Sequence, residues 1–193
     1  MKVVIIKYNA GNVQSLEFAL NRLGIDPTVT DDHEEIQQAD KIIFPGQGEA
    51  RSAMNYLKDK KLDRVLTQLR QPVLGICLGM QLMCSHTEEN DTACLGIMDA
   101  KVKRFEGSFK IPHMGWNNIT QLSGVLFAEI KEQDYLYFVH SYYVNICEQT
   151  MAQAEYGNNF SVALQKNNFY AIQPHPEKSA DCGIQILDNF LKI

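Results

Sequence analysis

The stretch that decides the fold is Val73-Leu74-Gly75-Ile76-Cys77-Leu78-Gly79-Met80-Gln81-Leu82-Met83-Cys84. Its apolar start predicts a buried strand up to Ile76, and the residues after Gly79 predict a helix, so Cys77 stands in a sharp strand-to-helix turn. Such a turn leaves no room for a Cβ atom two positions before or after its centre, which accounts for Gly75 and Gly79. The turn pushes the Cys77 side chain out over the edge of the sheet.

A thiol at this position is a candidate nucleophile. Unpaired N–H groups and the macrodipole in the first turn of a helix favour a thiolate and lower the pKa of a cysteine. A cysteine in an apolar strand-helix junction is also commonly a small core residue. The turn around Cys77 therefore leaves both interpretations open, and other residues have to decide between them.

The length and composition predict a single domain that covers residues 1–193. Domains contain about 100–200 residues, and 45% of this chain is apolar, which is enough for a full core. There is no run of about 18 apolar residues for a membrane span, and the apolar part of Met1–Lys7 is too short for a signal peptide. We therefore expect a cytoplasmic protein that does not contact membranes.

The cysteines and charges exclude further classes. The 5 cysteines are odd in number and include no C-x-x-C pair, so we expect reduced thiols, no metal site and no cofactor. The net charge is −5, and the longest basic block is Lys58-Asp59-Lys60-Lys61, so the sequence lacks the positive patch of a nucleic-acid-binding protein. This short cluster is typical of a solvated helix face.

The first 85 residues alternate between strand and helix patterns. Residues 2–6, 27–30 and 40–44 read as strands, Asn12 reads as the N-cap of a helix that Gly24 ends, and residues 31–35 read as an acidic loop or a helix start. This alternation predicts an α/β fold with a doubly wound, mostly parallel sheet. Ligands bind such sheets at the carboxyl ends of their strands.

The second half changes in character. Short β-rich segments broken by Gly, Asn and Pro follow one another at residues 96–105, 118–122, 135–144, 151–156, 160–165 and 169–173. We interpret all of them as an antiparallel extension of the same sheet. The apolar spacing within residues 180–193 predicts a closing helix.

Pro45-Gly46-Gln47-Gly48 follows the third predicted strand, at the same sheet edge as Cys77. Glycines at such a place can form a simple turn, or they can let backbone N–H groups come close to a reacting atom. The neighbouring nucleophile favours the second function.

A candidate base lies near the end of the chain. A thiol needs a base to hold it as thiolate and to protonate the leaving amine, and the usual base is a histidine oriented by a third polar group. His175 and Glu177, both on one side of an extended His-x-Glu stretch, suit these roles, and the prolines on both sides of His175 fix the backbone there. The other histidines are expected to be structural: His33, His86, His113 and His140.

Together these residues resemble the class I (triad) glutamine amidotransferases. The resemblance rests on Gly75–Gln81 and on His175-Pro176-Glu177. The resemblance covers essentially the whole chain. It implies a flavodoxin-like fold with a doubly wound, mostly parallel sheet and an antiparallel extension. More specific segments resemble the branch of the family that serves histidine biosynthesis: Asn9-Ala10-Gly11-Asn12, Pro45–Gly48, Pro112-His113-Met114-Gly115-Trp116-Asn117, Tyr137–Tyr143 and His175–Ser179.

The resemblance implies a reaction and a role for each site residue. Cys77 would attack the side-chain amide of L-glutamine to give a γ-glutamyl thioester and ammonia, while His175 shuttles the proton and Glu177 orients His175. The oxyanion hole would be formed by the backbone of Gly46, Gln47, Gly48 and Leu78. Glutamine would be held by the side chains of Gln81 and Glu89 and by the backbone of His140, Ser141 and Tyr142.

The resemblance also implies a partner. Ammonia would pass through a channel to a (βα)₈-barrel cyclase subunit, which with this chain forms a heterodimer that makes imidazole glycerol phosphate and an aminoimidazole carboxamide ribotide (AICAR). The residues that resemble the interface of this family are Asn9, Asn12, Trp116 and Lys178.

Three other functions stay open at this point. A glutaminase that serves another synthase, such as one making anthranilate or pyridoxal phosphate, would share the elbow and the His-x-Glu pair; residues 113–117 favour the histidine branch. A non-catalytic binding or thiol-sensor module on the same fold would lack the base or its orienter, and both are present. A peptidase-like hydrolase has only the shared thiol chemistry in its favour.

Overall fold

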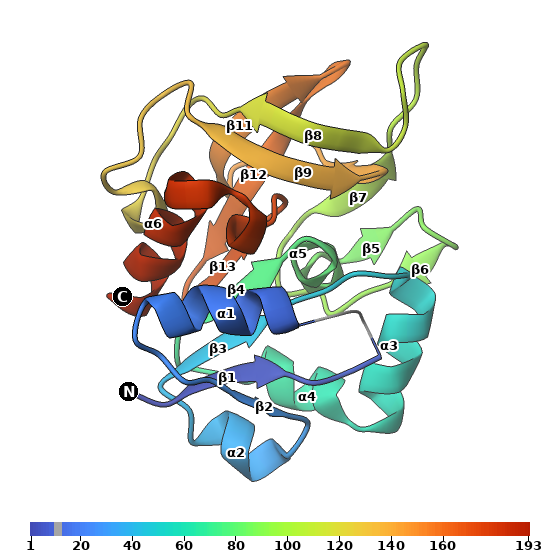
Figure 1. The fold of residues 1–193 in the computed structure, drawn as a ribbon. Helices are drawn as coiled ribbons and strands as arrows, with labels where there is room; N and C mark the ends of the chain where they lie inside the picture. Colours follow the sequence, from blue (N-terminus) through green and yellow to red (C-terminus); the bar gives the residue numbers. More distant parts are fainter. Residues whose placement is uncertain (10–12) are drawn as a thin grey trace.

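The computed structural model describes residues 1–9 and 13–193, and its elements are shown in Figure 1. The predicted N-cap Asn12 therefore lies outside the described residues. The helices are α1 (Gln14–Arg22), α2 (His33–Gln37), α3 (Ala50–Asp59), α4 (Leu62–Thr67), α5 (Leu78–Met83) and α6 (Ala180–Leu191), with 3₁₀ turns η1 (Val125–Phe127) and η2 (Pro176–Lys178). The strands are β1 (Val3–Ile6), β2 (Thr28–Thr30), β3 (Lys41–Phe44), β4 (Val73–Ile76), β5 (His86–Thr87), β6 (Thr92–Ala93), β7 (Lys101–Arg104), β8 (His113–Asn118), β9 (Tyr135–His140), β10 (Tyr142–Val144), β11 (Thr150–Tyr156), β12 (Asn158–Lys166) and β13 (Phe169–Ile172).

A seven-stranded sheet in the order β11-β12-β13-β4-β3-β1-β2 forms the centre of the molecule. The five strands from β13 to β2 are parallel, and β12 and β11 continue the sheet in antiparallel pairing. The predicted mostly parallel sheet with an antiparallel extension is confirmed.

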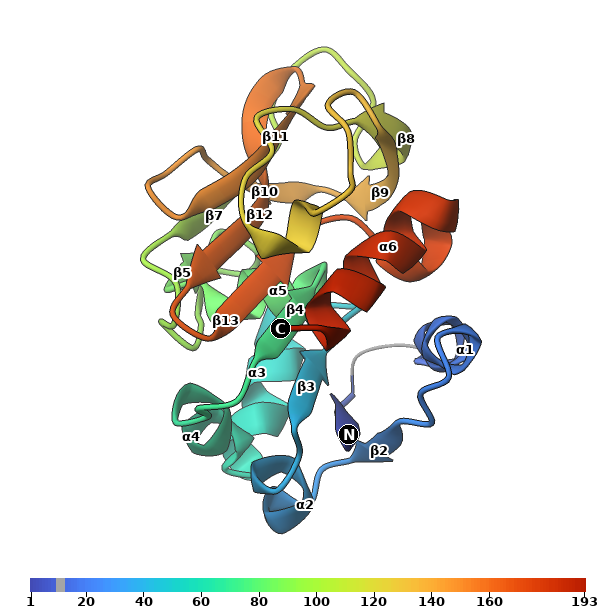
Figure 2. The ribbon, with the colours of Figure 1, turned by 90° about the vertical axis from the view of Figure 1, so that its left-hand side faces the viewer.

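Helices cover both faces of this sheet. Figure 2 shows α1 and α6 on one side and α2, α3 and α4 on the other. Because successive side chains of a strand point to opposite faces, Val3 and Ile5 of β1 pack in the core under α1 and α6, while Val4 and Ile6 pack in the other core. A strand buried on both faces is apolar throughout, which explains the unbroken Val-Val-Ile-Ile run.

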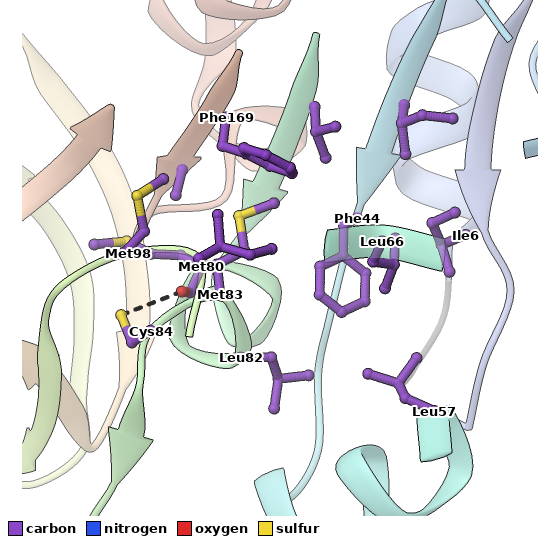
Figure 3. Packing of buried hydrophobic residues seen from close by; sticks show 14 of the residues in the cluster. Ile6, Phe44, Leu57, Leu66, Met80, Leu82, Met83, Cys84, Met98 and Phe169 are labelled. Carbon is purple, nitrogen blue, oxygen red and sulfur yellow. Dashed lines mark hydrogen bonds between the residues drawn. The ribbon is translucent and has the colours of Figure 1, made fainter. Parts of the chain in front are cut away.

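The core beside α5 is rich in sulfur (Figure 3). Met80 and Met83 of α5 pack there with Met98, Phe44 and Leu82. The thiol of Cys84 donates to the Met80 carbonyl oxygen at 3.5 Å within the same core. Flexible thioethers fill irregular gaps well. The methionines therefore pack the helix after Cys77 against the sheet.

The prediction that all later strands join one sheet is wrong. Only β11, β12 and β13 belong to the central sheet; β5, β6, β7 and β10 form a four-stranded sheet, and β8 and β9 form a separate ribbon. The segment 135–144, predicted as one strand, bends at Ser141, so β9 pairs with β8 while β10 pairs with β7. Residues 118–122 contain only the end of β8 and a single bridge from Thr120 to Gln153.

Local signals in the first half are confirmed. Gly24, with φ +76°, follows the end of α1, and the acidic segment starts a helix in which Asp32 accepts from the backbone N–H groups of Glu34 and Glu35 at 3.0 and 2.9 Å. The basic cluster is exposed where α3 ends. No helix within residues 1–9 and 13–193 is long and apolar enough to cross a membrane.

The three strands β13, β4 and β3 are neighbours in the sheet and end at the same edge. Gln173 to His175 follow β13, Cys77 follows β4, and the Pro45–Gly48 loop follows β3. The topology therefore brings the predicted base, nucleophile and glycine loop together, at the edge where open α/β sheets bind ligands.

Candidate active site

Cys77 occupies the predicted strained turn, with φ 52° and ψ −109°. An L residue rarely adopts a positive φ, and such conformations persist only where the surroundings hold them. Here the Cys77 N–H donates to the Ile172 carbonyl at 2.8 Å. A Cβ at Gly79 would collide with the Phe44 carbonyl oxygen, and one at Gly75 would lie 2.7 Å from the Met83 sulfur. The two glycines are thus required by close packing of strand and helix.

His175 and Glu177 form a buried pair. Nδ1 of His175 lies 2.8 Å from Oε1 of Glu177, and the two side chains are only 2% and 8% exposed. Because a carboxylate only accepts, Nδ1 carries a proton and Nε2 is the atom left for chemistry. Neither Nε2 of His175 nor Oε2 of Glu177 has a hydrogen-bond partner in the described part of the chain.

The surroundings of His175 favour its charged form. Burial lowers the pKa of His175, but the Cys77 sulfur and the Glu177 carboxylate outweigh it and raise the pKa to about 10. A protonated imidazole beside a sulfur favours the thiolate, because opposite charges stabilise each other in a site of low dielectric constant. The arrangement therefore favours a charged imidazole beside the Cys77 sulfur near neutral pH.

The predicted extended His-x-Glu stretch is wrong in its local conformation. His175 itself is extended, but Pro176 begins the 3₁₀ turn η2, so Glu177 reaches Nδ1 around a turn. Proline suits this first position because its missing N–H would be unpaired there and its φ is already set. Ser179 Oγ donates to the His175 carbonyl at 2.6 Å and closes the turn.

One of the predicted oxyanion donors is already engaged by the glycine loop. The Leu78 N–H, a predicted donor, already donates to the Gly46 carbonyl oxygen at 3.4 Å. Next to it, the Tyr8 hydroxyl donates to the Pro45 carbonyl at 2.5 Å and leaves no space for a side chain at Gly46. The Gly46 carbonyl must turn away before Leu78 can bind a developing negative charge.

A cavity of about 410 Å³ opens above Cys77. Most of the predicted site residues line it: Gln47, Gly48, Cys77, Leu78, Gln81, Glu89, His140, Ser141, Tyr142, His175 and Lys178. Pro112 and Val139 complete the lining. Gly46 and Glu177 line a second, much smaller cavity next to it. The volume is within the usual range of about 300–1,000 Å³ for small-molecule sites.

Hydrogen bonds fix the orientations of two polar side chains in the cavity. Both N–H groups of the Gln81 amide donate, one to the Tyr142 carbonyl at 3.1 Å and one to Oε1 of Gln173 at 3.0 Å. The oxygen of Gln81 therefore remains available as an acceptor. Glu89 accepts the Ala50 N–H at 2.8 Å. Burial raises the pKa of Glu89, and Glu49 raises it further against the effect of the Ala50 bond.

Sequence reasoning missed two contacts of the nucleophile. The Cys77 thiol lies 3.9 Å from the Val139 carbonyl oxygen, and the amide nitrogen of Gln173 lies 3.7 Å from the sulfur. The available signal for Gln173 was its position, since it directly follows β13 and precedes Pro174 and the predicted base. A glutamine is common enough at a strand end that this position alone indicated nothing.

His113 and His140 form a buried pair with fixed tautomers. His140 Nδ1 donates to the Tyr142 carbonyl at 2.7 Å, so its Nε2 accepts from His113 Nδ1 at 2.9 Å. The His113 ring is stacked between Phe138 and Tyr156. Burial lowers the pKa of His113 to about 4 and is the main cause that lowers that of His140 to about 3. Both rings are therefore neutral in the folded protein at pH 7.

This pair predicts a loss of stability in mild acid. Both folded pKa values lie below the ordinary value of about 6.5, so the unfolded chain binds more protons once the pH falls below that value. We expect the free energy of unfolding, measured in urea, to approach a decrease of about 1.4 kcal/mol per pH unit for each ring between pH 6.5 and pH 4. His33→Gln, at a half-buried histidine of α2 away from this pair, should keep this slope. Equal stability at pH 7 and pH 5 would contradict the neutral pair.

The described residues among the predicted interface positions come from different elements: Trp116 from β8, Lys178 from η2, and Asn9 from the segment after β1. Trp116 is 52% exposed on β8 with its ring against Tyr137 of β9, and Lys178 is exposed at the cavity. Asn9 donates to Ser52 Oγ of α3 at 2.9 Å. Asn12 lies outside the described residues, and the interface stays a prediction.

The described residues include no group of three or more His, Cys, Asp or Glu side chains that could hold a metal ion. All five cysteines are free.

Comparison with known proteins agrees with this geometry. The family model of glutamine amidotransferase class-I matches residues 4–193. The imidazole glycerol phosphate synthase subunit HisH of Bacteroides thetaiotaomicron is 53% identical to this chain, with 100% of both chains covered, and the HisH subunit of Pectobacterium atrosepticum is 45% identical over the same share.

Solved structures show the same fold at low sequence identity. The crystal structure of a glutamine amidotransferase superimposes with a TM-score of 0.76 at 18% identity, over 98% of this chain and 97% of that one. PurLQS from Thermotoga maritima gives 0.71 at 17% identity, over 99% and 97% of the two chains. With a family match over nearly its whole length, the chain belongs to the class-I glutamine amidotransferases.

Proposed function

We propose that this chain is the glutaminase subunit of an imidazole glycerol phosphate synthase and supplies ammonia for histidine biosynthesis. Relatives that carry this synthase name are 53% and 45% identical over the full length of both chains. The observation that carries the chemistry is a cavity lined by a cysteine at a strained elbow and by a histidine that is paired with a buried carboxylate.

In the first step Cys77 attacks glutamine. The thiolate sulfur bonds to the side-chain amide carbon, and the carbonyl oxygen becomes an oxyanion. His175, protonated on Nε2, gives that proton to the amide nitrogen as the carbon–nitrogen bond breaks, so ammonia leaves and a γ-glutamyl thioester remains on Cys77. The raised pKa of His175, about 10, keeps this proton available.

In the second step the thioester is hydrolysed. His175, now neutral, takes a proton from water, and the hydroxide adds to the thioester carbonyl carbon. The carbon–sulfur bond breaks, glutamate leaves and the thiolate–imidazolium pair is restored. Glu177 holds Nδ1 throughout, so that Nε2 is the atom that exchanges protons in both steps.

The cavity contains acceptors for the amino-acid end of glutamine. We propose that the remaining oxygen of Gln81 and the carboxylate of Glu89 accept the α-ammonium group. The backbone of residues 140–142, which also lines the cavity, is proposed to bind the substrate chain. Lys178 adds a positive charge at the same cavity, where it can attract the α-carboxylate.

We propose that the partner is a (βα)₈-barrel cyclase subunit that forms a heterodimer with this chain and receives the ammonia. The outer face of the β8–β9 ribbon supports a partner in this region. Met114, Trp116 and Tyr135 are each more than half exposed on it, and large apolar side chains clustered on a surface commonly mark interaction sites. Val139 of the same ribbon lines the cavity, so this face lies next to the site where ammonia is released.

The Gly46–Leu78 hydrogen bond predicts that the chain alone is almost inactive. One missing oxyanion donor costs about 10²–10³ in kcat, and glycines on both sides of Gln47 allow the peptide to turn. A partner that favours the turned loop restores the donor. We expect glutamine hydrolysis at least 10²-fold slower for the free chain than for its complex with the cyclase and its nucleotide ligand.

Glutamate release should be measured for the chain alone, with the cyclase subunit, and with cyclase plus ligand. A free chain that runs within about tenfold of the liganded complex would rule out the blocked donor, since the loss of one donor costs more than that. Absence of glutamine hydrolysis in all three mixtures would instead refute the proposed function.

A further inference from the structure

Gln173 is fully buried and contacts the nucleophile without a role in the reaction described above. It follows β13, its backbone N–H donates to the Val162 carbonyl at 2.8 Å, and its side chain is 0% exposed. Its amide nitrogen Nε2 lies 3.7 Å from the Cys77 sulfur. A buried amide that points at a reactive sulfur requires an explanation, because buried polar groups are normally paired for a reason of structure or chemistry.

The hydrogen bonds around Gln173 determine which end of its amide meets the sulfur. The Tyr142 carbonyl can only accept, so the Gln81 atom beside it at 3.1 Å is the nitrogen. The second N–H of that nitrogen then donates to Gln173 at 3.0 Å, which makes the receiving atom the Gln173 oxygen. The nitrogen of Gln173 is left on the side of Cys77, and Gln81 prevents the amide from flipping.

We propose that Gln173 is a further catalytic residue, which donates an N–H of its side chain to the Cys77 sulfur and stabilises the thiolate, in an orientation fixed by Gln81. The inference rests on the proposed role of Cys77 as nucleophile. It adds a neutral donor to the charged partner that His175 provides.

The sulfur needs such a donor because it is buried. Cys77 is 8% exposed, and its other close polar contact is the Val139 carbonyl, an acceptor that suits a thiol and opposes a thiolate. His175 supports the thiolate only while it is charged, and it loses that charge when it protonates the departing amide nitrogen. Gln173 is a neutral donor, so its hydrogen bond to the sulfur does not depend on whether His175 carries its proton.

The titratable groups that act on the sulfur are His175, which directly precedes η2, and Tyr8 after β1. Burial, and then the charge of Cys77, raise the pKa of Tyr8 well above 10, so it stays neutral through the working range. Glu177 acts on the sulfur through His175, and the nearby His140 is neutral with a pKa of about 3. A titration of Cys77 between pH 4 and pH 9 thus reports mainly the thiol and its imidazole partner.

Gln173→Met tests the donor, because methionine has similar length and flexibility and no N–H. The rate of alkylation of Cys77 by iodoacetamide should be followed against pH, with the Cys77 peptide quantified by mass spectrometry. We expect the apparent pKa of the reactive thiolate to rise by about one to two units, because a hydrogen bond to a charged group is worth about 10- to 100-fold. The control is Gln165→Met, at a half-buried glutamine paired with Tyr170 near the start of β13, which should leave the profile unchanged.

An unchanged pH profile of Cys77 alkylation in Gln173→Met would overturn the proposal. This includes the case in which only the KM for glutamine rises, because that result would show that Gln173 only holds Gln81 in place. If Gln173→Met shows no cooperative unfolding transition and is therefore not folded, NMR of the wild-type protein tests the same hydrogen bond. The Gln173 side-chain N–H resonance should move with the Cys77 titration and stop moving in Cys77→Ser; a resonance that ignores the titration would also overturn the proposal. These readouts need no turnover, so a failed glutaminase assay remains a separate result.

Discussion

Replacement of Cys77 by alanine should abolish glutamine-dependent turnover, by about 10⁴-fold or more, while the complex with its partner still uses added ammonia. The thioester cannot form without the sulfur, and removal of a nucleophile from a nucleophile–base unit costs several orders of magnitude in comparable enzymes. Ammonia use survives because we place the chemistry of the acceptor on the other subunit. Product formation from glutamine and from ammonium salts, measured side by side, checks both halves of this expectation.

Cys84→Ala is the matched control. Cys84 is buried in the sulfur-rich core, its thiol is bonded to the Met80 carbonyl, and burial strongly raises its pKa, so it is not a nucleophile at neutral pH. This variant should keep glutamine-dependent turnover and lose only some stability. The assignment of Cys77 is wrong if Cys84→Ala loses glutaminase activity and Cys77→Ala keeps it.

His175→Ala should be nearly as inactive as the Cys77 variant, whereas Glu177→Gln should keep measurable activity. The base takes part in both proton transfers, so its loss is expected to cost about 10⁴-fold or more. The orienting acid acts only through His175, and the loss of such a group costs on the order of 10- to 100-fold less. The measurement is kcat for glutamine hydrolysis by the complex, with each variant assembled with the same partner.

The pH–rate profile of the Glu177 variant is a second measurement, and a merely structural role of Glu177 would leave it unchanged. Glutamine at this position can still accept the Nδ1 proton, but it removes a negative charge that raises the pKa of His175. The upper limb of the pH–rate profile should therefore shift to lower pH. His86→Gln, on a surface histidine paired with Asp91, should change neither kcat nor the profile. Equal and mild effects at His175 and Glu177 would mean that another group activates Cys77.

The residues of the site were predictable from the sequence because their signals are local. The glycines at 75 and 79 are dictated by contacts within one strand–turn–helix unit, and a collision with the Phe44 carbonyl confirms why Gly79 has no side chain. The alternation of strands and helices then places the ends of β3, β4 and β13 at one edge, so His175 comes to Cys77 across about a hundred residues of chain. The family resemblance supplied the residues proposed to bind glutamine, and all five of them line the same cavity.

What the sequence did not predict depends on long-range pairing. Nothing local to residues 135–144 indicates that a bend at Ser141 assigns β9 to one sheet and β10 to another, because that choice is made by the distant strands β8 and β7. The engagement of the Leu78 N–H by Gly46 is likewise a contact between two loops. The role inferred for Gln173 needed the hydrogen bonds of Gln81 and Tyr142, which fix the direction of its amide.

The most direct test of the central claim follows the amide nitrogen of glutamine. The chain, assembled with the cyclase subunit encoded in the same organism, should be given glutamine labelled with ¹⁵N in its amide, the nucleotide acceptor and an excess of unlabelled ammonium at pH 7. Our account predicts imidazole glycerol phosphate that contains ¹⁵N in the wild-type complex and only unlabelled nitrogen in the complex with Cys77→Ala. A wild-type complex that consumes no glutamine and forms only unlabelled product would contradict it.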